Sequence, residues 1–269
     1  LMWLAHNQDA VSGAFVARAV VAPKVVLGTA PRAAKDTVLD IPTYMSAHAT
    51  LALCEGVALF PSPRLRESAG RAVHFLLTAR NPYGAWGQSY PPNGSSDLET
   101  TCVAVMALTA AREIGIAVTD DVFQGVLAYL DQMTDDNTWR TGGGSKDGYT
   151  SREPGLNVRW PAEKVETNTA YAMFARLQMG VSAGMSPALR GGADLLRKHL
   201  PLWSEQEGTI DYRYWYAGTL AMFQMGGKDW DVWKQRLLDA VLKAQRAQGD
   251  ENGSWDPQFD PHGHRGGRV

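Results

Sequence analysis

The sequence predicts an all-α fold in which paired helices form an inner and an outer layer around a ring. Two observations carry this prediction: a short phrase that recurs at the ends of helical stretches, and two kinds of helix that alternate along the chain. Repetition of one supersecondary unit indicates an architecture in which neighbouring copies stack and bury a shared core. No stretch of alternating apolar and polar residues competes as a strand pattern.

The repeated phrase combines a glycine with an aromatic residue two positions later. Residues 81–86 read Asn-Pro-Tyr-Gly-Ala-Trp, residues 250–255 read Asp-Glu-Asn-Gly-Ser-Trp, and residues 7–15 hold a diverged copy that ends in Phe15. Each copy follows an amphipathic stretch. Because glycine allows the positive φ that ends a helix, we expect Trp86 and Trp255 to pack back over the helix end as buried wedges.

The two kinds of helix differ in how much of their surface is apolar. Amphipathic helices with charges along one face are predicted for the outer layer, at residues 64–77, 120–130, 187–200 and 230–242. Helices that are apolar on most sides and rich in small residues are predicted for the inner layer, because neighbours must bury them. These inner helices occupy residues 44–59, 98–111, 167–180 and 212–226. With a partial helix at residues 1–8, the sequence predicts nine helices.

Length and charge limit the classes of protein. The 269 residues support one large domain, and the repeat favours a single domain over residues 1–269. Both ends fall within a repeat, so we expect the ring to be incomplete at both ends and the chain to be a fragment of a longer one. A net charge of −2 lacks the basic surface of a nucleic-acid-binding protein. No apolar run reaches the roughly 20 residues that span a bilayer, and the sequence leaves the cellular compartment open.

Two cysteines and two long connections complete the outline. Cys54 and Cys102 lie in apolar helical stretches and are predicted to be buried as small hydrophobic residues. The connections at residues 16–43 and 134–164 are long, and the second is rich in glycine. Long connections of this kind are either functional or simple insertions, and the sequence leaves both readings open.

These features together resemble the squalene-cyclase and prenyltransferase repeat superfamily, which folds as an α/α toroid. The loops that end at Trp86 and Trp255 and the alternation of helix types carry the resemblance over nearly the whole chain. The closer similarity is to uncharacterised bacterial repeat proteins of that superfamily, through the phrases at residues 52–55, 131–136, 149–151 and 214–227. The resemblance implies the toroid fold, whereas toroids of this shape host unrelated chemistries.

Residues 97–101, Asp-Leu-Glu-Thr-Thr, open an inner helix and hold the candidate catalytic residues Asp97 and Glu99. Class II terpene cyclases place a similar motif, Asp-x-Asp-Asp or Asp-x-Asp-Thr-Thr, at such a point, and its middle acid protonates an alkene. That chemistry needs a protonated carboxylic acid facing an apolar cavity lined with aromatic rings. Here the middle residue is Glu99, whose longer side chain displaces the acidic proton. The alternative interpretation is helix capping by Ser95, Ser96 or Asp97, with Glu99 favoured by the helix dipole.

Aromatic and polar residues near the starts of the inner helices form the candidate ligand-binding set. This set comprises Tyr44, His48, Thr100, Glu166, Asn168, Asp211, Tyr212, Tyr214, Trp215 and Tyr216. Aromatic rings bind apolar or cationic ligands, and polar groups that converge at one end of an apolar cavity fit a ligand site. In a toroid, one mouth of the cavity would carry the ring of Asp97, Glu99, Glu166, Asp211 and His48. Packing between the layers and simple helix capping are the alternatives.

The sequence predicts no metal or cofactor site. Protein prenyltransferases of this fold bind zinc through Asp, Cys and His, but the Asp-x-Cys spacing is absent around Cys54 and Cys102. His262 and His264 are only a pair on a glycine-rich end. Residues 142–146 are rich in glycine but lack the preceding strand of a phosphate-binding loop.

The predicted function is a non-catalytic ligand-binding or scaffold domain. Its central cavity would hold an apolar, isoprenoid-like molecule or a segment of a partner protein. The alternative is a class II-type terpene cyclase that uses the acid motif at Asp97 and Glu99. Other toroid chemistries, such as polysaccharide cleavage, stay open. An intact acid motif lined by aromatic rings favours a cyclase, whereas a binding domain needs only the cavity.

Overall fold

The computed structural model describes residues 1–15, 41–92, 94–141, 166–256 and 259–260. It divides into two compact units, residues Leu1–Asp120 and Asp121–Val269, and each is described by itself. Most of the two long connections, residues 142–146 and 149–151, and His262 and His264 lie outside the described residues.

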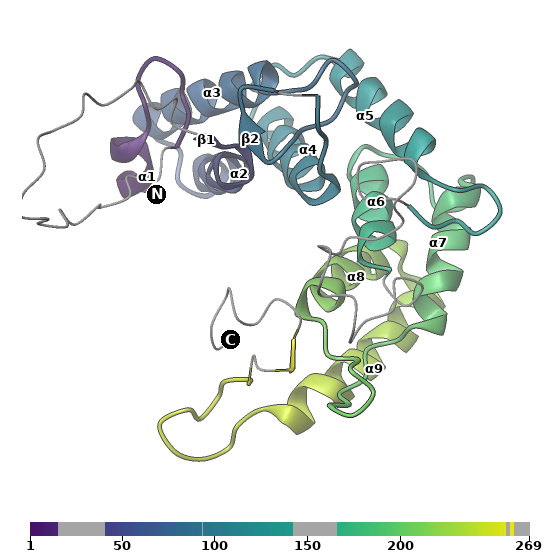
Figure 1. Cartoon of the computed structure of the whole chain (residues 1–269). Coiled ribbons are helices and arrows are strands. Elements are labelled where there is room, and N and C mark those ends of the chain that lie inside the picture. The colour runs from purple at the N-terminus through teal and green to yellow at the C-terminus, as the bar shows by residue number, and fades with distance from the viewer. Residues whose placement is uncertain (16–40, 93, 142–165, 257–258, 261–269) are drawn as a thin grey trace, which may run out of the picture. The chain divides into compact units, whose positions relative to one another are not determined.

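Unit 1 contains four helices and two short strands, which are labelled in Figure 1. In chain order they are α1 (Met2–Asn7), β1 (Ile41–Pro42), α2 (Thr43–Leu59), α3 (Pro63–Thr78), β2 (Ser89–Tyr90) and α4 (Leu98–Glu113). The strands pair antiparallel, with Ile41 opposite Tyr90. Unit 2 contains α5 (Asp120–Met133, whose first residue ends unit 1), α6 (Thr167–Gln178), α7 (Pro187–Lys198), α8 (Tyr212–Met225) and α9 (Gly227–Ala244).

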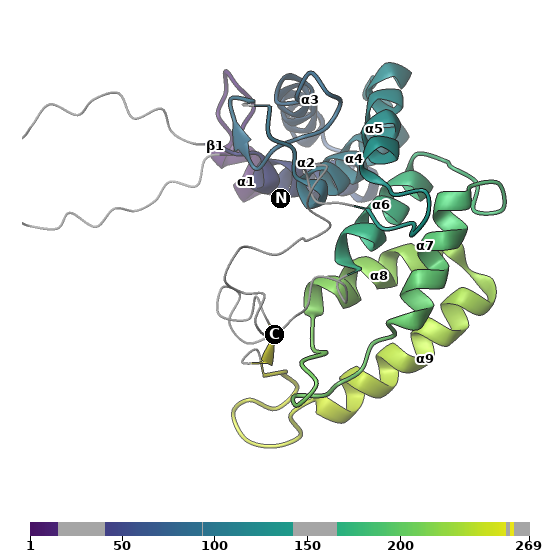
Figure 2. The same ribbon diagram turned by 45° about the vertical axis from the view of Figure 1, so that its right-hand side comes forward.

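In unit 1, α2 packs along α4, and α3 lies across one side of this pair (Figures 1 and 2). The face that α3 turns inward is made by apolar residues one turn apart, namely Leu65, Ala69, Ala72 and Leu76, which are all buried. The apolar residues of α2 and α4 are not confined to one stripe, and Leu53 and Leu108 are completely buried. The helix with an amphipathic pattern, α3, therefore covers the pair, and the two helices that are apolar on most sides, α2 and α4, form the pair beneath it.

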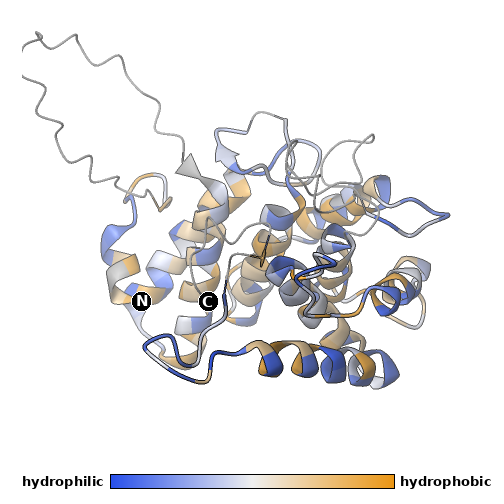
Figure 3. Ribbon diagram, turned by 60° about the horizontal axis from the view of Figure 1, so that its bottom comes forward, coloured by the Kyte–Doolittle hydropathy of each residue, from blue (hydrophilic) through white to orange (hydrophobic). Residues whose placement is uncertain are grey.

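Unit 2 repeats this arrangement. Helix α6 packs along α8, α7 and α9 contact each other, and each of them contacts one or both of the paired helices. Residues Thr167–Arg176 of α6 are buried without interruption, whereas α9 buries only Trp233 and Ala240 and shows hydrophilic residues along its length (Figure 3). Gly218 of α8 admits the Trp233 ring, since an added Cβ would overlap it. The Trp233 indole then donates a hydrogen bond to the Thr219 hydroxyl at 3.0 Å.

The all-α fold class is confirmed, and nine helices lie within the described residues. The helices predicted as inner start where expected: α2 begins one residue before Tyr44, while Asp97, Glu166 and Asp211 are the N-cap residues of α4, α6 and α8. The start of α9 was predicted too late, at Trp230 instead of Gly227. Gly226 and Gly227 both have positive φ, which turns the chain between α8 and α9 within two residues. The β1–β2 pair was not predicted, because two residues are too few to show a period.

The repeated loops place an indole N–H on the preceding helix, as a wedge requires. Trp86 is completely buried and donates to the carbonyl of Leu76 at 2.7 Å, in the last turn of α3. Trp255 donates to the carbonyl of Val241 at 2.7 Å, in the last turn of α9. Carbonyls in the last turn have no partner within a helix, so each tryptophan satisfies one of them. Trp255 is only half-buried, so the expectation that both rings are largely buried holds for Trp86 alone.

Candidate functional site

In unit 1, Asp97 caps α4. Its Oδ1 accepts hydrogen bonds from the Thr100 backbone N–H at 2.7 Å and from the Thr100 hydroxyl at 2.6 Å. Its Oδ2 accepts a longer one, 3.3 Å, from the Gln88 amide. In all three hydrogen bonds the carboxyl group of Asp97 is the acceptor. This geometry is the N-cap arrangement, in which a side-chain oxygen satisfies the first free N–H groups of a helix.

Glu99 faces residues of α2 rather than a second carboxylate. The Tyr44 hydroxyl donates to Glu99 Oε1 at 3.2 Å. The Tyr44 ring meets the His48 ring edge-on, with centroids 4.5 Å apart. Burial lowers the pKa of His48, while the charge of Glu99 opposes this with a smaller effect. The starts of α2 and α4 therefore bring Tyr44, His48 and Glu99 into one half-buried polar cluster.

In unit 2, the start of α6 holds a completely buried carboxylate, Glu166. Arg140 donates to its Oε1 from Nε at 2.8 Å and from Nη2 at 2.6 Å. The Thr169 hydroxyl donates to Oε2 at 3.3 Å, and His199 Nε2 lies 3.8 Å from Oε1. The Asn168 side chain is also buried, and its Nδ2 has no hydrogen-bond partner among the described residues.

Asp211 and Tyr214 complete this part of unit 2. Asp211 Oδ1 accepts from the Tyr214 backbone N–H at 2.9 Å, which makes Asp211 a second helix cap. The Tyr214 hydroxyl donates to the carbonyl of His199 at 2.7 Å. Burial raises the pKa of Tyr214 well above its ordinary value, and the charges of Glu166 and Asp211 raise it further. Tyr214 is therefore a neutral hydrogen-bond donor inside the unit.

The aromatic residues at the start of α8 contact different neighbours. Tyr214 packs edge-on against Trp233, with centroids 5.5 Å apart, between the two layers. Tyr212 and Trp215 instead contact each other and Trp203, with centroid distances of 5.8 to 6.1 Å. Tyr216 is 53% exposed. The alternative of packing between the layers therefore describes Tyr214, whereas Tyr212 and Trp215 belong to an aromatic cluster with Trp203.

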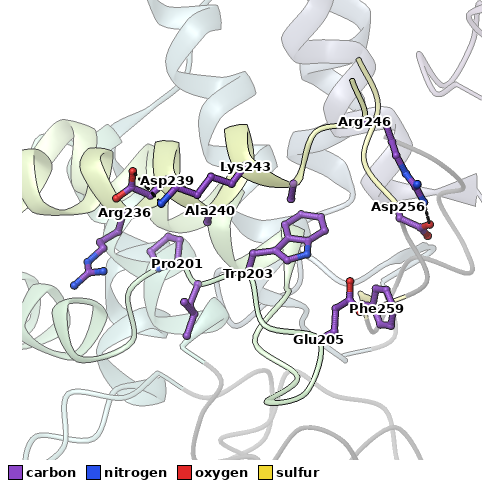
Figure 4. Close-up of a pocket in the computed structure, with 12 residues that line it drawn as sticks. Pro201, Trp203, Glu205, Arg236, Asp239, Ala240, Lys243, Arg246, Asp256 and Phe259 are labelled. Carbon is purple, nitrogen blue, oxygen red and sulfur yellow. Dashed lines mark hydrogen bonds and ion pairs between the residues drawn. The ribbon is translucent and has the colours of Figure 1, made fainter. Parts of the chain in front are cut away.

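This aromatic cluster borders a cavity of about 570 Å³ (Figure 4). Trp203 lies between side chains of α9 and Glu205 in the view of Figure 4. The lining comprises Pro201, Leu202, Trp203, Glu205, Arg236, Asp239, Ala240, Lys243, Ala244, Arg246, Asp256 and Phe259. Arg246 pairs with Asp256 at 3.1 Å, and Lys243 lies 4.0 Å from Asp239. The cavity thus combines aromatic rings with charged groups of both signs, most of them paired.

The predicted site residues fall into two sets, one in each unit. Tyr44, His48, Asp97, Glu99 and Thr100 belong to unit 1, and the remaining predicted residues belong to unit 2. Sequence reasoning missed Arg140, His199 and Trp203, which lie on loops or at a helix end. Their partners are distant along the chain, and no periodic pattern marks them. The sequence offers one indirect indication of Arg140. Glu166 stands at the start of an apolar helix, and an acid that is buried there needs a cation close by.

Among the described residues, no helix is long and apolar enough to cross a membrane. The same residues contain no group of three or more His, Cys, Asp or Glu side chains placed to hold a metal ion. Cys54 and Cys102 are completely buried, and burial raises the pKa of Cys54 to about 12 and that of Cys102 further still. Both thiols are therefore protonated in the fold, as expected for small hydrophobic residues.

No protein-family model matches the chain, and no curated protein matches it significantly. Among solved structures, the chain is similar to the apo structure of the type II terpene cyclase MstE from Scytonema, at 15% sequence identity and a TM-score of 0.40. The match covers 94% of this chain and 78% of that one. This is a weak likeness at the level of the fold alone. The closer similarity to bacterial repeat proteins stays a prediction.

Proposed function

We propose that the chain is a non-catalytic binding domain. The single observation that carries this proposal is the bonding of Asp97, whose carboxyl group accepts three hydrogen bonds at the start of α4. Protonation of an alkene needs a carboxylic acid that keeps its proton and is free to present it. Hydrogen-bond donors contact both oxygens of Asp97, so its carboxyl group is engaged in capping the helix.

Glu99 gives the alternative little support. Its Oε1 also accepts a hydrogen bond, from Tyr44, and its side chain is half-exposed to water. The proton donor of a cyclase must instead keep its proton while facing a dry, apolar cavity. The carboxyl groups of Asp97 and Glu99 accept hydrogen bonds from different residues.

Trp203, which packs against Tyr212 and Trp215 and lines a cavity, is the proposed binding surface. Its cavity of about 570 Å³ has the size of a small-molecule pocket. Trp203 offers an apolar face, and the charged side chains that also line the cavity offer polar contacts. The ligand that fits best has an apolar body and a polar end. A linear isoprenoid alcohol is a small molecule of this kind. An amphipathic segment of a partner protein is the other candidate ligand.

The test is binding of farnesol to the purified protein, measured by calorimetry alongside product analysis by mass spectrometry. We expect saturable binding, weakened about tenfold in Trp203→Ala because the aromatic face is removed. Ala244→Phe, which fills the cavity and removes nothing, should weaken binding equally. Tyr83→Ala removes a 72% exposed ring in unit 1 and is the matched control, for which unchanged affinity is expected.

The same experiment separates the binding domain from the cyclase. Glu99→Gln should bind farnesol as the unmodified protein does, and neither should release a cyclised product. A cyclised product that disappears in Glu99→Gln would overturn the non-catalytic proposal. Saturable binding that is indifferent to both Trp203→Ala and Ala244→Phe would place the ligand elsewhere and contradict the proposed surface.

A further inference from the structure

The loop after α5 is another copy of the repeated phrase. In the first copy, the Asp9 backbone N–H donates to the carbonyl of Ala14 at 3.0 Å, and Gly13 N–H donates to the carbonyl of Asp9 at 2.9 Å. The loop of residues 135–141 repeats both bonds, from Asp135 to Arg140 at 2.9 Å and from Trp139 to Asp135 at 2.7 Å. The two loops are also closed by equivalent bridges, Gln8 with Phe15 and Thr134 with Thr141.

Trp139 occupies the position at which the other copies have glycine. Gly13, Gly84 and Gly253 have φ values of 74°, 92° and 87°, and Trp139 has a φ of 61°. The left-handed region costs a bulky residue about 1–2 kcal/mol relative to glycine. A tryptophan at this position therefore opposes local stability, and such outliers gather at sites where a side chain must be aimed in one direction.

Helix α7 is shaped to receive the Trp139 ring. A Cβ added at Gly191 would overlap the ring, so only glycine leaves room for it there. The ring stays half-exposed and forms one wall of a cavity of about 410 Å³, whose other walls include Arg140, Lys198 and His199. The cavity lies wholly between the loop after α5 and α7, within unit 2.

Among the described residues, the charged side chains that line this cavity differ in whether they have a partner. Arg140 pairs with the buried Glu166, and Asp194 shares Arg197 with Asp229. Lys198, which also lines the cavity, has no ion pair or hydrogen bond among the described residues. A ligand in this cavity therefore meets the Lys198 ammonium group beside an aromatic face.

From this arrangement we propose a second binding site, in which Trp139 stacks on the aromatic ring of a ligand and Lys198 pairs with a carboxylate or phosphate group on that ring. The site is separate from the cavity beside Trp203, because the two cavities share no lining residue. Stacking supplies the apolar part of the affinity and the ammonium group the charged part.

The test is calorimetric titration of the whole chain with four probes: phenyl phosphate, benzoate, inorganic phosphate and benzyl alcohol. The two aromatic anions are expected to bind at least about tenfold more tightly than either the anion alone or the ring alone. Their binding should weaken as salt is added, because Lys198 is exposed. Equal binding of all four probes, or binding of none, would overturn the proposal. Binding of only one of the two aromatic anions would support it and show whether the site recognises a phosphate or a carboxylate group.

Trp139→Gly is the decisive variant, because it restores the residue that the other copies of the loop use. We expect it to keep or raise the melting temperature while affinity for the aromatic anions falls about tenfold. A large drop in melting temperature with unchanged affinity would show that Trp139 is only a packing wedge. Lys198→Met removes no described ion pair or hydrogen bond, and it should weaken the binding of both aromatic anions about fivefold at low salt. If the glycine variant does not fold, unchanged affinity in Lys198→Met overturns the proposal.

Discussion

Arg140 donates two hydrogen bonds to one carboxylate oxygen of Glu166, at 2.8 and 2.6 Å, and so joins the loop after α5 to the start of α6. The Glu166 side chain is completely buried, whereas 27% of the Arg140 side chain is exposed. Burying a carboxylate is costly, and its cost is tolerated here because a cation and the Thr169 hydroxyl bind it. The ion pair therefore holds the loop that carries Trp139 against the start of α6.

Breaking this pair from one side should be strongly destabilising. Arg140→Met leaves the buried Glu166 carboxylate without its cation, and we expect unfolding by urea to show a loss of about 3 kcal/mol. The double variant Arg140→Met with Glu166→Leu removes both charges and should recover most of that loss. A double variant as unstable as Arg140→Met alone would mean that the pair is not the source of the cost.

The two tryptophan wedges should differ in their contribution to stability. Trp86 is completely buried, so Trp86→Ala should cost about 3–5 kcal/mol in free energy of unfolding. Trp255 makes the equivalent hydrogen bond but is half-buried, so Trp255→Ala should cost about 1–2 kcal/mol. Equal costs measured by thermal or chemical unfolding would contradict this reading. Trp86→Phe retains a ring but orphans the Leu76 carbonyl, and an intermediate loss is expected.

Stability should depend on pH through His48. Burial lowers the pKa of His48 below its ordinary 6.5, so the folded state favours the neutral imidazole. The stabilisation is complete above pH 6.5 and is lost as the pH falls through the folded-state pKa. The stability of the unmodified protein relative to His48→Gln should therefore decrease as the pH falls below 6.5.

Glu99→Gln provides the control for this pH dependence. The charge of Glu99 holds the pKa of His48 up against the larger effect of burial. Without that charge, the pKa of His48 should fall further and the loss of stability should move to lower pH. Titration of the His48 ring by NMR would measure both shifts, and a His48 pKa above 6.5 in the unmodified protein would show that burial is not the dominant effect.

The sequence by itself determined the features that depend on residues close together in the chain. The starts of α4 and α8 were predictable because Asp97 and Asp211 are caps that act within one helical turn. The Trp86 loop was predictable because a glycine at positive φ and an aromatic ring two residues later form a local device. The covering role of α3 followed from apolar residues at helical spacing.

Only the tertiary structure decided which distant side chains meet. Arg140 finds Glu166 across 26 residues of sequence, and Trp203 joins Tyr212 and Trp215 through a loop with no period. The position of Trp139 was also hidden, because a glycine-based pattern does not reveal a copy in which tryptophan has replaced the glycine. Caps and amphipathic faces are fixed by bonds within a few residues, whereas ion pairs, ring contacts and cavities depend on how helices pack, which local sequence does not specify.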